Sequence, residues 1–254
     1  RRVLFRSKDT LEKCYHTFYH PSNMMLFVVG NIDPQKTMTL IRENQAKKHF
    51  EKENQIQREN VDEPQDVDQD ELILNMDVVM PKLIVSMKIN DILTEPSQKL
   101  KRELSMNLLL DLLFAKSSKL YEDWMRQGFI NDSFSANFTQ ERNYSFLQIG
   151  GDTQEPEKLR DKIYELIESI DSFEIDEADF QRVQKKNIGI LIGVFNSPES
   201  IANMFSRYYF EGIMIFDLID CLASLSLDDV NQLKSLFDKK YLSTCMIKPK
   251  ENGQ

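Results

Sequence analysis

Hydrophobic and polar residues alternate in four short stretches, a pattern typical of β-strands with one buried face. The alternating stretches are residues 72–78, 83–89, 134–138 and 144–148. The first two flank a Met-Pro-Lys turn and predict an antiparallel hairpin with one buried face. The other two flank a turn at 140–143 and predict a second hairpin, and a last strand is expected over 243–247.

Apolar residues at helical spacing predict helices between and after these strands. The first predicted helix carries Leu100, Leu104, Leu108 and Leu112, one every four residues. The predicted helices are residues 97–116, 118–127 (closed by Gly128), 155–172, 176–195, 197–210 and 226–239. Strand pairs separated by groups of helices predict an α+β fold, in which an antiparallel-rich mixed sheet has helices packed mainly on one face.

A shorter set of elements precedes this region. Residues 11–20 predict the end of a helix, and residues 24–30 predict a buried strand. Asp33 and Pro34 have the form of an N-cap followed by Pro at the first helical position, so a helix is expected to about residue 49. Residues 8–50 are too few to fold alone, and we interpret them as the tail of a preceding, similar domain.

The negative charge of the chain is concentrated between these two parts. The net charge is -9, and residues 51–71 hold nine acidic and two basic side chains, a net of -7. This stretch has few aliphatic residues, which predicts an acidic linker and places the C-terminal domain at 72–254. The rest of the chain is close to neutral, which argues against a nucleic-acid partner, because phosphate binding needs a clustered basic face.

Cysteine use and hydropathy limit the compartment. Cys14, Cys221 and Cys245 are widely spaced and odd in number, which favours a reducing, cytoplasmic setting over a disulfide framework or a cysteine zinc site. No stretch approaches 18 uninterrupted apolar residues, so no membrane contact is expected.

Residues 1–7 match the translation of a common sequencing-library adapter, and we expect native sequence to begin near Lys8.

Two histidines invite a metal hypothesis. His16 and His20 stand four apart, the spacing that places two imidazoles on one helix face for zinc. A zinc peptidase helix also carries a carboxylate between them as general base, but the intervening residues are Thr, Phe and Tyr. Pro21 follows at once, so His20 lies where a helix ends. Capping and packing are therefore favoured, and a zinc site completed by His49 stays as the weaker alternative.

The same stretch carries a family resemblance. Phe-Tyr-His-Pro-Ser-Asn-Met at 18–24, followed by Leu-Phe-Val-Val-Gly-Asn-Ile-Asp at 26–33, resembles the insulinase/pitrilysin-type zinc metallopeptidases, the inverzincins. In that family this turn follows the zinc domain's helix, and the zinc motif His-x-x-Glu-His lies well upstream. Nothing in this chain matches that motif. The resemblance implies a C-terminal part that begins after its own active site, with Zn²⁺ bound in the full-length parent by two His and a Glu, and no cofactor here.

A second resemblance concerns the substrate site. Leu-Tyr-Glu-Asp-Trp-Met-Arg-Gln-Gly at 120–128 is similar to a family segment whose Arg, with a Tyr shortly after it, reaches the substrate carbonyl and the oxyanion. The matching positions here are Met125 and Asn131. Arg126 is one position late, so on a helix it points roughly 100° away from the required face. The resemblance therefore implies neither a catalytic nor a metal-binding residue in this chain and leaves its substrate-binding residues unknown.

This departure resembles one half of a bacterial pairing within the family. Some members occur as unlike subunits, one with zinc and without the Arg/Tyr pair and the other the reverse. The segments at 128–134 and 144–152 resemble the zinc-bearing type. The implied partners are the preceding zinc domain, a second insulinase-type subunit (unlike, as a heterodimer, or identical) and a peptide substrate bound as an added strand.

The chain is accordingly interpreted as the C-terminal, non-zinc-binding part of an insulinase-type zinc metallopeptidase subunit. It would help to enclose peptide substrates and be inactive alone. The alternative is a non-catalytic interaction or scaffold subunit of the same fold. Two other signals favour structural roles: Gly150-Gly151-Asp152 as a strand-ending turn rather than a phosphate loop, and Arg207-Tyr208-Tyr209 as packing with a snorkelling cation.

Overall fold

The computed structural model describes residues 7–50, 56 and 63–250, and one mixed sheet organises most of them. Its strands lie in the order β1-β5-β2-β4-β3. Their bounds are β1 Glu71–Met76, β2 Lys82–Ile89, β3 Ser135–Gln140, β4 Ser145–Asp152 and β5 Leu242–Pro249. β1 pairs with β5 in parallel, and the three other pairings are antiparallel.

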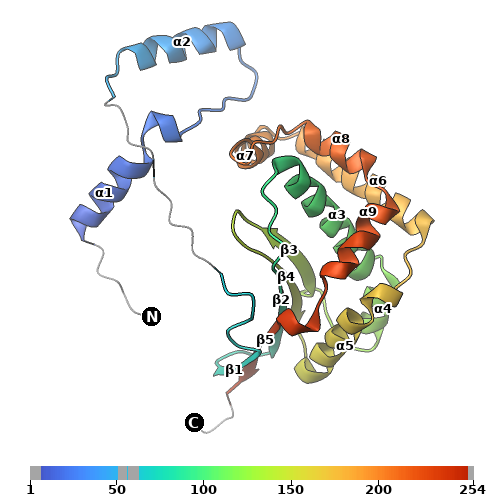
Figure 1. Cartoon of the computed structure of the whole chain (residues 1–254). Coiled ribbons are helices and arrows are strands. Elements are labelled where there is room, and N and C mark those ends of the chain that lie inside the picture. The colour runs from blue at the N-terminus through green and yellow to red at the C-terminus, as the bar shows by residue number, and fades with distance from the viewer. Residues whose placement is uncertain (1–6, 51–55, 57–62, 251–254) are drawn as a thin grey trace.

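The helices that follow β2 gather on one face of this sheet (Figure 1). Their bounds are α3 Pro96–Phe114, α4 Lys119–Arg126, α5 Pro156–Glu168, α6 Glu177–Val194, α7 Pro198–Tyr209, α8 Asp217–Ser224 and α9 Leu227–Asn231. The expected α+β fold, an antiparallel-rich mixed sheet with helices mainly on one face, is confirmed.

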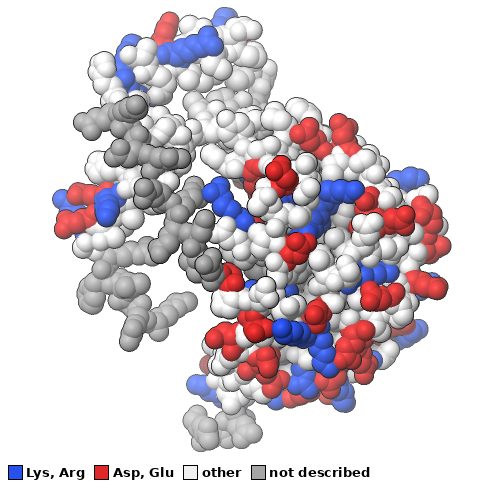
Figure 2. Space-filling model, in the orientation of Figure 1, with Lys and Arg blue, Asp and Glu red and all other residues white. Residues whose placement is uncertain are grey.

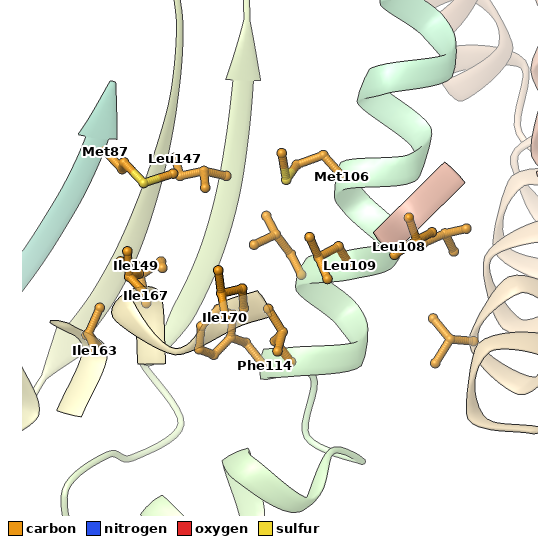
Figure 3. Close-up of a cluster of buried hydrophobic side chains, with 14 of the residues drawn as sticks. Met87, Met106, Leu108, Leu109, Phe114, Leu147, Ile149, Ile163, Ile167 and Ile170 are labelled. Atoms are coloured by element: carbon orange, nitrogen blue, oxygen red, sulfur yellow. The ribbon is translucent and has the colours of Figure 1, made fainter. Parts of the chain in front are cut away.

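The core lies between the sheet and α3. Met87 of β2 and Leu147 of β4 point from the sheet toward Met106 and Leu109 of α3 (Figure 3), and all four are at most 1% exposed. Side chains alternate between the two faces of a strand, so this burial uses every second residue of β2 and β4. The opposite face of the sheet carries the remaining residues, among them Lys82, Ile84 and Gln148, and no helix in the described part of the chain covers it.

One of the two expected hairpins forms. β3 and β4 are antiparallel neighbours joined by a turn in which the N–H of Glu141 donates to the carbonyl of Tyr144 over 2.8 Å. The expected hairpin of 72–78 with 83–89 is wrong, because β5 lies between β1 and β2 and hydrogen-bonds to both. β1 also lacks the expected buried face, since all six of its residues are exposed.

Some of the helices begin at cap residues that the sequence indicates. Ser118 caps α4, and Ser226 with Asp229 forms a capping box at α9. The predicted helix at 226–239 is shorter than expected, because α9 ends at Asn231 and continues as a 3-10 helix over Gln232–Leu236. The sequence reasoning missed α8, a short helix whose N-cap, Phe216, supplies no side-chain acceptor.

The N-terminal part lies apart from the sheet (Figure 1). It contains α1 Lys8–Phe18 and α2 Pro34–Ala46, and neither helix has a buried residue. Asp33 caps α2 as predicted, accepting from the N–H groups of Gln35 and Lys36. Residues 24–30 are extended, but the expected buried strand is not found: no strand among the described residues pairs with them, and Leu26 is 66% exposed.

Part of the expected linker lies against the sheet domain. Residues 51–55 and 57–62 of the predicted linker at 51–71, like residues 1–6 of the expected adapter sequence, lie outside the described residues. After them, the Gln65 carbonyl accepts a hydrogen bond from Asn90 over 3.0 Å, and Asp66 pairs with Lys240 at 3.0 Å. The last residue of the predicted linker, Glu71, is the first residue of β1.

Two glycines let the backbone of β4 approach closely to β2 and to the residues just before β3. Gly150 and Gly151 lie within β4, which continues to Asp152. The interpretation of this stretch as a strand-ending turn is therefore wrong. Gly150 has φ +157°, and a Cβ built there would lie 2.0 Å from the Leu83 carbonyl oxygen. A Cβ on Gly151 would meet the Phe134 backbone at 2.8 Å. These glycines therefore serve strand packing, and they do not open a helix as a phosphate loop does.

Replacing Gly150 by Ala should destabilise the fold. The backbone conformation alone costs roughly 1–3 kcal/mol for a residue with a side chain, and the clash with Leu83 adds to it. The matched control is Gly189→Ala, on an exposed position of α6 with nothing within 4 Å, which should gain roughly 0.5–1 kcal/mol. Urea unfolding measures both, and a Gly150→Ala protein as stable as the parent would contradict the assigned backbone approach.

Asp229 should make the free energy of unfolding depend on pH in the acidic range. Its ion pair with Lys101 (2.6 Å), with hydrogen bonds from Ser226, lowers its pKa from the ordinary 3.8 to about 2. Because the folded pKa lies below the unfolded one, this stabilisation is complete above about pH 4 and is lost as the pH falls through 2. Asp229→Ala should cost roughly 1–2 kcal/mol at pH 7. Its deficit in urea unfolding should shrink below pH 4, whereas exposed Asp228→Ala should stay within roughly 0.5 kcal/mol of the parent at both pH values.

Candidate functional site

The segment with the Arg/Tyr resemblance begins on α4. Tyr121 and Trp124 are each 5% exposed and pack against Phe134, with ring centroids 6.2 and 6.0 Å away. Gly128, at φ +76°, ends the helix, and the N–H of Phe129 reaches back to the Trp124 carbonyl over 3.0 Å, as in a Schellman motif. The predicted closure by Gly128 is confirmed. The buried aromatic rings thus fix the direction of the chain toward residues 129–134.

Met125 and its neighbour Arg126 on α4 have different surroundings. Met125 is half-buried and packs against the hydrophobic core. Arg126 is an exposed neighbour whose guanidinium pairs with Asp123, one turn earlier on the same helix. Met125, at the position of the family's arginine, therefore contributes apolar packing. The adjacent Arg126 lies along the surface of α4.

Asn131 organises the loop between α4 and β3. Its Nδ2 donates to the Asp152 carbonyl over 3.0 Å, and its Oδ1 accepts from the N–H of Ser133 over 2.8 Å. Ser133 Oγ in turn accepts from the N–H of Asp152 over 2.7 Å. The side chain that occupies the family's tyrosine position thus joins the loop to the end of β4.

A cavity of about 280 Å³ opens beside this loop, on the sheet face that none of the described helices covers. Strands β2, β4 and β3 form its floor. Its lining residues are Lys82, Leu83, Ile84, Ser133, Ser135, Asn137, Gln148, Ile149, Gly150, Gly151 and Asp152. Asn131 bonds to two of these residues, whereas Met125 lies outside the lining. The cavity is thus a hollow that combines apolar surface with several polar side chains, next to only one of the two predicted positions.

The sequence reasoning missed this hollow, although its polar residues carry a signal. Ser135, Asn137, Gln148 and Asp152 occupy the outward positions of two strands whose inward positions are apolar. Alternation alone identifies such residues as solvent-facing. The missing information was the register, which places Asn137 opposite Gln148 and Ser135 opposite Gly150.

The histidine pair does not form a helix-face site. α1 ends at Phe18, so His16 lies in its last turn and His20 lies beyond it. His20 caps a 3-10 helix, Pro21–Asn23, by accepting from the N–H of Ser22, which confirms the capping interpretation. Within the described ranges, no group of three or more His, Cys, Asp or Glu side chains could hold a metal ion, so the alternative zinc site with His49 is wrong. The residues present do not fit a bound zinc ion.

The Arg207-Tyr208-Tyr209 cluster lies elsewhere, where α7 meets α3. Arg207 pairs with Glu103 at 2.7 Å, and the guanidinium lies 5.1 Å from the Tyr208 ring centroid. The Tyr208 hydroxyl donates to the same carboxylate over 3.2 Å, and burial holds the pKa of Tyr208 well above its usual value. Tyr208 is 5% exposed and the Arg207 side chain stays 58% exposed, so the interpretation as packing with a snorkelling cation is confirmed, and the cation is also paired with Glu103.

Charge and hydropathy add two observations about the surface. Acidic and basic side chains are interspersed over the sheet domain on the face that Figure 2 shows. In the part of the chain that the structure describes, no helix combines the length and the apolar character needed to cross a lipid bilayer. All three cysteines are free thiols, and burial raises the pKa of Cys221.

The described residues thus form a one-sided α+β sheet domain whose open face carries the hollow beside the Asn131 loop. The model of the "Peptidase M16 inactive domain" matches residues 7–187, and the chain belongs to this family. This is the insulinase-type family that the sequence resembled, and the resemblance is confirmed.

Relatives agree with this membership. The chain is 41% identical over 246 residues to "uncharacterized zinc protease YmfH" of Bacillus subtilis (strain 168), covering 96% of this chain and 57% of that protein. A crystal structure of a putative M16-like peptidase from Alicyclobacillus acidocaldarius superposes with a TM-score of 0.90 at 27% identity, over 96% of this chain and 58% of that one. A protease from Helicobacter pylori shares the fold, with a TM-score of 0.82 at 19% identity over 96% and 59%. The chain thus spans little more than half the length of these proteins.

Asn131→Ala should loosen the loop at the hollow. It removes one donor to the Asp152 carbonyl and one acceptor for the Ser133 N–H, so we expect a loss of roughly 1–2 kcal/mol in urea unfolding. The control is Asn137→Ala, an exposed strand residue whose hydrogen bond to Ser135 is 3.4 Å long, and it should change stability by less than roughly 0.5 kcal/mol. Equal effects of the two variants would rule out the loop-joining role of Asn131.

Proposed function

We propose that this chain is the non-zinc-binding C-terminal part of an insulinase-type zinc metallopeptidase subunit that helps to enclose peptide substrates. The open face of its sheet would form the inner wall of the enclosure, and the helices would lie outside. The observation that carries this proposal is the hollow on the sheet face that the described helices leave free, in a chain that belongs to the M16 family.

The chemistry of the chain supports inactivity when it is alone. Hydrolysis of a peptide bond needs an activated water and stabilisation of the oxyanion. The sequence has no His-x-x-Glu-His, and its described residues offer no metal site. Met125 is apolar, and Asn131 uses its side chain on Asp152 and Ser133, so we propose no catalytic residue in this chain.

The zinc would belong to the full-length parent. Two relatives are named zinc proteases, and this chain covers 57% and 44% of their lengths. We therefore propose that residues 8–50 are the tail of the zinc-bearing domain, 51–71 the linker and 72–254 the second domain. Exposed Met24, Leu26 and Val28 on the extended segment support this division, because burial against a neighbouring sheet would remove their apolar surface from water.

We further propose a second insulinase-type subunit, unlike or identical, as the partner that completes the enclosure. Exposed apolar residues of β1, such as Ile73 at 48%, support a further protein contact at that edge of the sheet. The spacing of Cys14, Cys221 and Cys245 as free thiols supports a cytoplasmic location.

A non-catalytic scaffold subunit is the second candidate. The same apolar surfaces would serve a protein that only binds other subunits. The two candidates differ in the parent's zinc domain, because an intact His-x-x-Glu-His upstream of Phe18 fits the peptidase and a degenerate one fits the scaffold.

The purified chain should contain almost no zinc and hydrolyse no peptide. Elemental analysis would measure zinc per chain for the parent sequence and for the double variant His16→Ala/His20→Ala, with the same near-zero value expected for both. Stoichiometric zinc that disappears in the double variant would contradict the proposal. So would peptide hydrolysis by the chain that 1,10-phenanthroline abolishes.

The same assays on the full-length parent distinguish the two candidates. The peptidase proposal expects about one zinc per subunit and hydrolysis of unstructured peptides that stops when zinc is removed and returns when it is added back. A zinc-free parent that assembles with other subunits and cleaves nothing would favour the scaffold.

A further inference from the structure

The hollow exists because a central position of the sheet has no side chain. Gly150 of β4 lies opposite Ile84 on β2 and opposite Ser135 on β3. Along β4, Gln148 and Asp152 lie two residues to either side of it and border the hollow. No L-residue fits at position 150, since a Cβ there would meet the Leu83 carbonyl. The gap between these side chains is therefore a fixed part of the sheet.

One end of the hollow is electrically neutral. Lys82 and Asp152 are cross-strand partners, and the Lys82 ammonium lies 2.5 Å from the Asp152 carboxylate. Each charge thus already has its counter-ion. A charged ligand group that entered here would lose water without gaining an unpaired opposite charge, which disfavours acidic and basic side chains.

The other end holds two side-chain amides with free hydrogen-bonding capacity. Asn137 and Gln148 are exposed cross-strand partners on neighbouring strands. Within the described part of the chain Gln148 makes no side-chain hydrogen bond, and Asn137 makes one of 3.4 Å to Ser135. Each amide offers at least one donor and an acceptor. Beside them, Ile84 gives the hollow one apolar wall, and it is 39% exposed.

A carboxamide matches this arrangement better than other side chains do. It carries no charge, and its N–H₂ and C=O can pair with an acceptor and a donor on the two facing amides. A purely apolar side chain would cover Asn137 and Gln148 without satisfying them, at a cost for each unpaired group. The methylene groups of a glutamine can rest on Ile84 while its amide reaches the polar end.

We propose that this hollow is a subsite for the carboxamide side chain of an asparagine or glutamine in an extended peptide. The inference rests on the proposed function, because a peptide enclosed against the open sheet face would pass over the hollow. It adds a preference at one position of the substrate: neutral polar side chains that both donate and accept are bound, and charged or apolar ones are bound less well.

The test measures binding of peptides to the 254-residue chain by fluorescence anisotropy. Labelled, unstructured peptides of one sequence would differ only at a central residue, which is Gln, Glu, Lys or Leu. We expect the Gln peptide to bind about tenfold more tightly than the other three, the effect of one or two hydrogen bonds. The double variant Asn137→Ala/Gln148→Ala should lose that tenfold advantage and bind the Leu peptide as the parent chain does.

The control is Thr139→Ala, on the same strand and the same sheet face but outside the hollow, and it should keep the Gln preference. Thermal unfolding of all variants would check that the fold is intact. If the four peptides bind equally and the double variant changes nothing, the subsite is overturned while the proposed function stands. If no peptide binds at all, the proposed role in enclosing peptides is overturned together with it.

Discussion

The packing of α3 on one face of the sheet is the interaction on which the rest of the structure depends. Leu109 is fully buried against the strands, and every second residue of β2 and β4 contributes to the same core. Because strand side chains alternate, placing Met87 and Leu147 in the core sends Ser86 and Gln148 to the other face. The polar open face is thus a direct consequence of the apolar covered one.

The sequence correctly predicted those strands and helix starts that depend on residues within one segment. Alternation located the strands, and Ser118, Ser226 and Asp33 located three helix starts, because a cap acts on its own first turn. It did not predict the neighbour of β1, since that neighbour is β5, about 170 residues later in the chain. The local turn after β1 favoured a hairpin, and pairing with β5 prevailed over it.

The candidate site divides in the same way. Resemblance identified Met125 and Asn131 from their positions in one short segment, and the bonds of Asn131 to Ser133 and Asp152 explain what that side chain does here. The hollow needs three strands in register, and its emptiness comes from a glycine whose Cβ would strike a neighbouring backbone. No single segment of sequence contains that information, although each lining residue is visible as an outward polar position.

The exposed apolar segments and the hollow therefore favour different kinds of contact. Exposed Leu26 and Ile73 lie on extended segments with a free edge, and water is a poor solvent for such side chains, so lasting contact with protein would stabilise them. The hollow is different, because its Lys82–Asp152 ion pair is complete and its exposed amides can hydrogen-bond to water. A ligand gains only the difference between its hydrogen bonds and those of water, which suits peptides that bind and leave. Under the proposed function, the apolar extended segments would serve assembly, and the open sheet face with its hollow would contact the peptide.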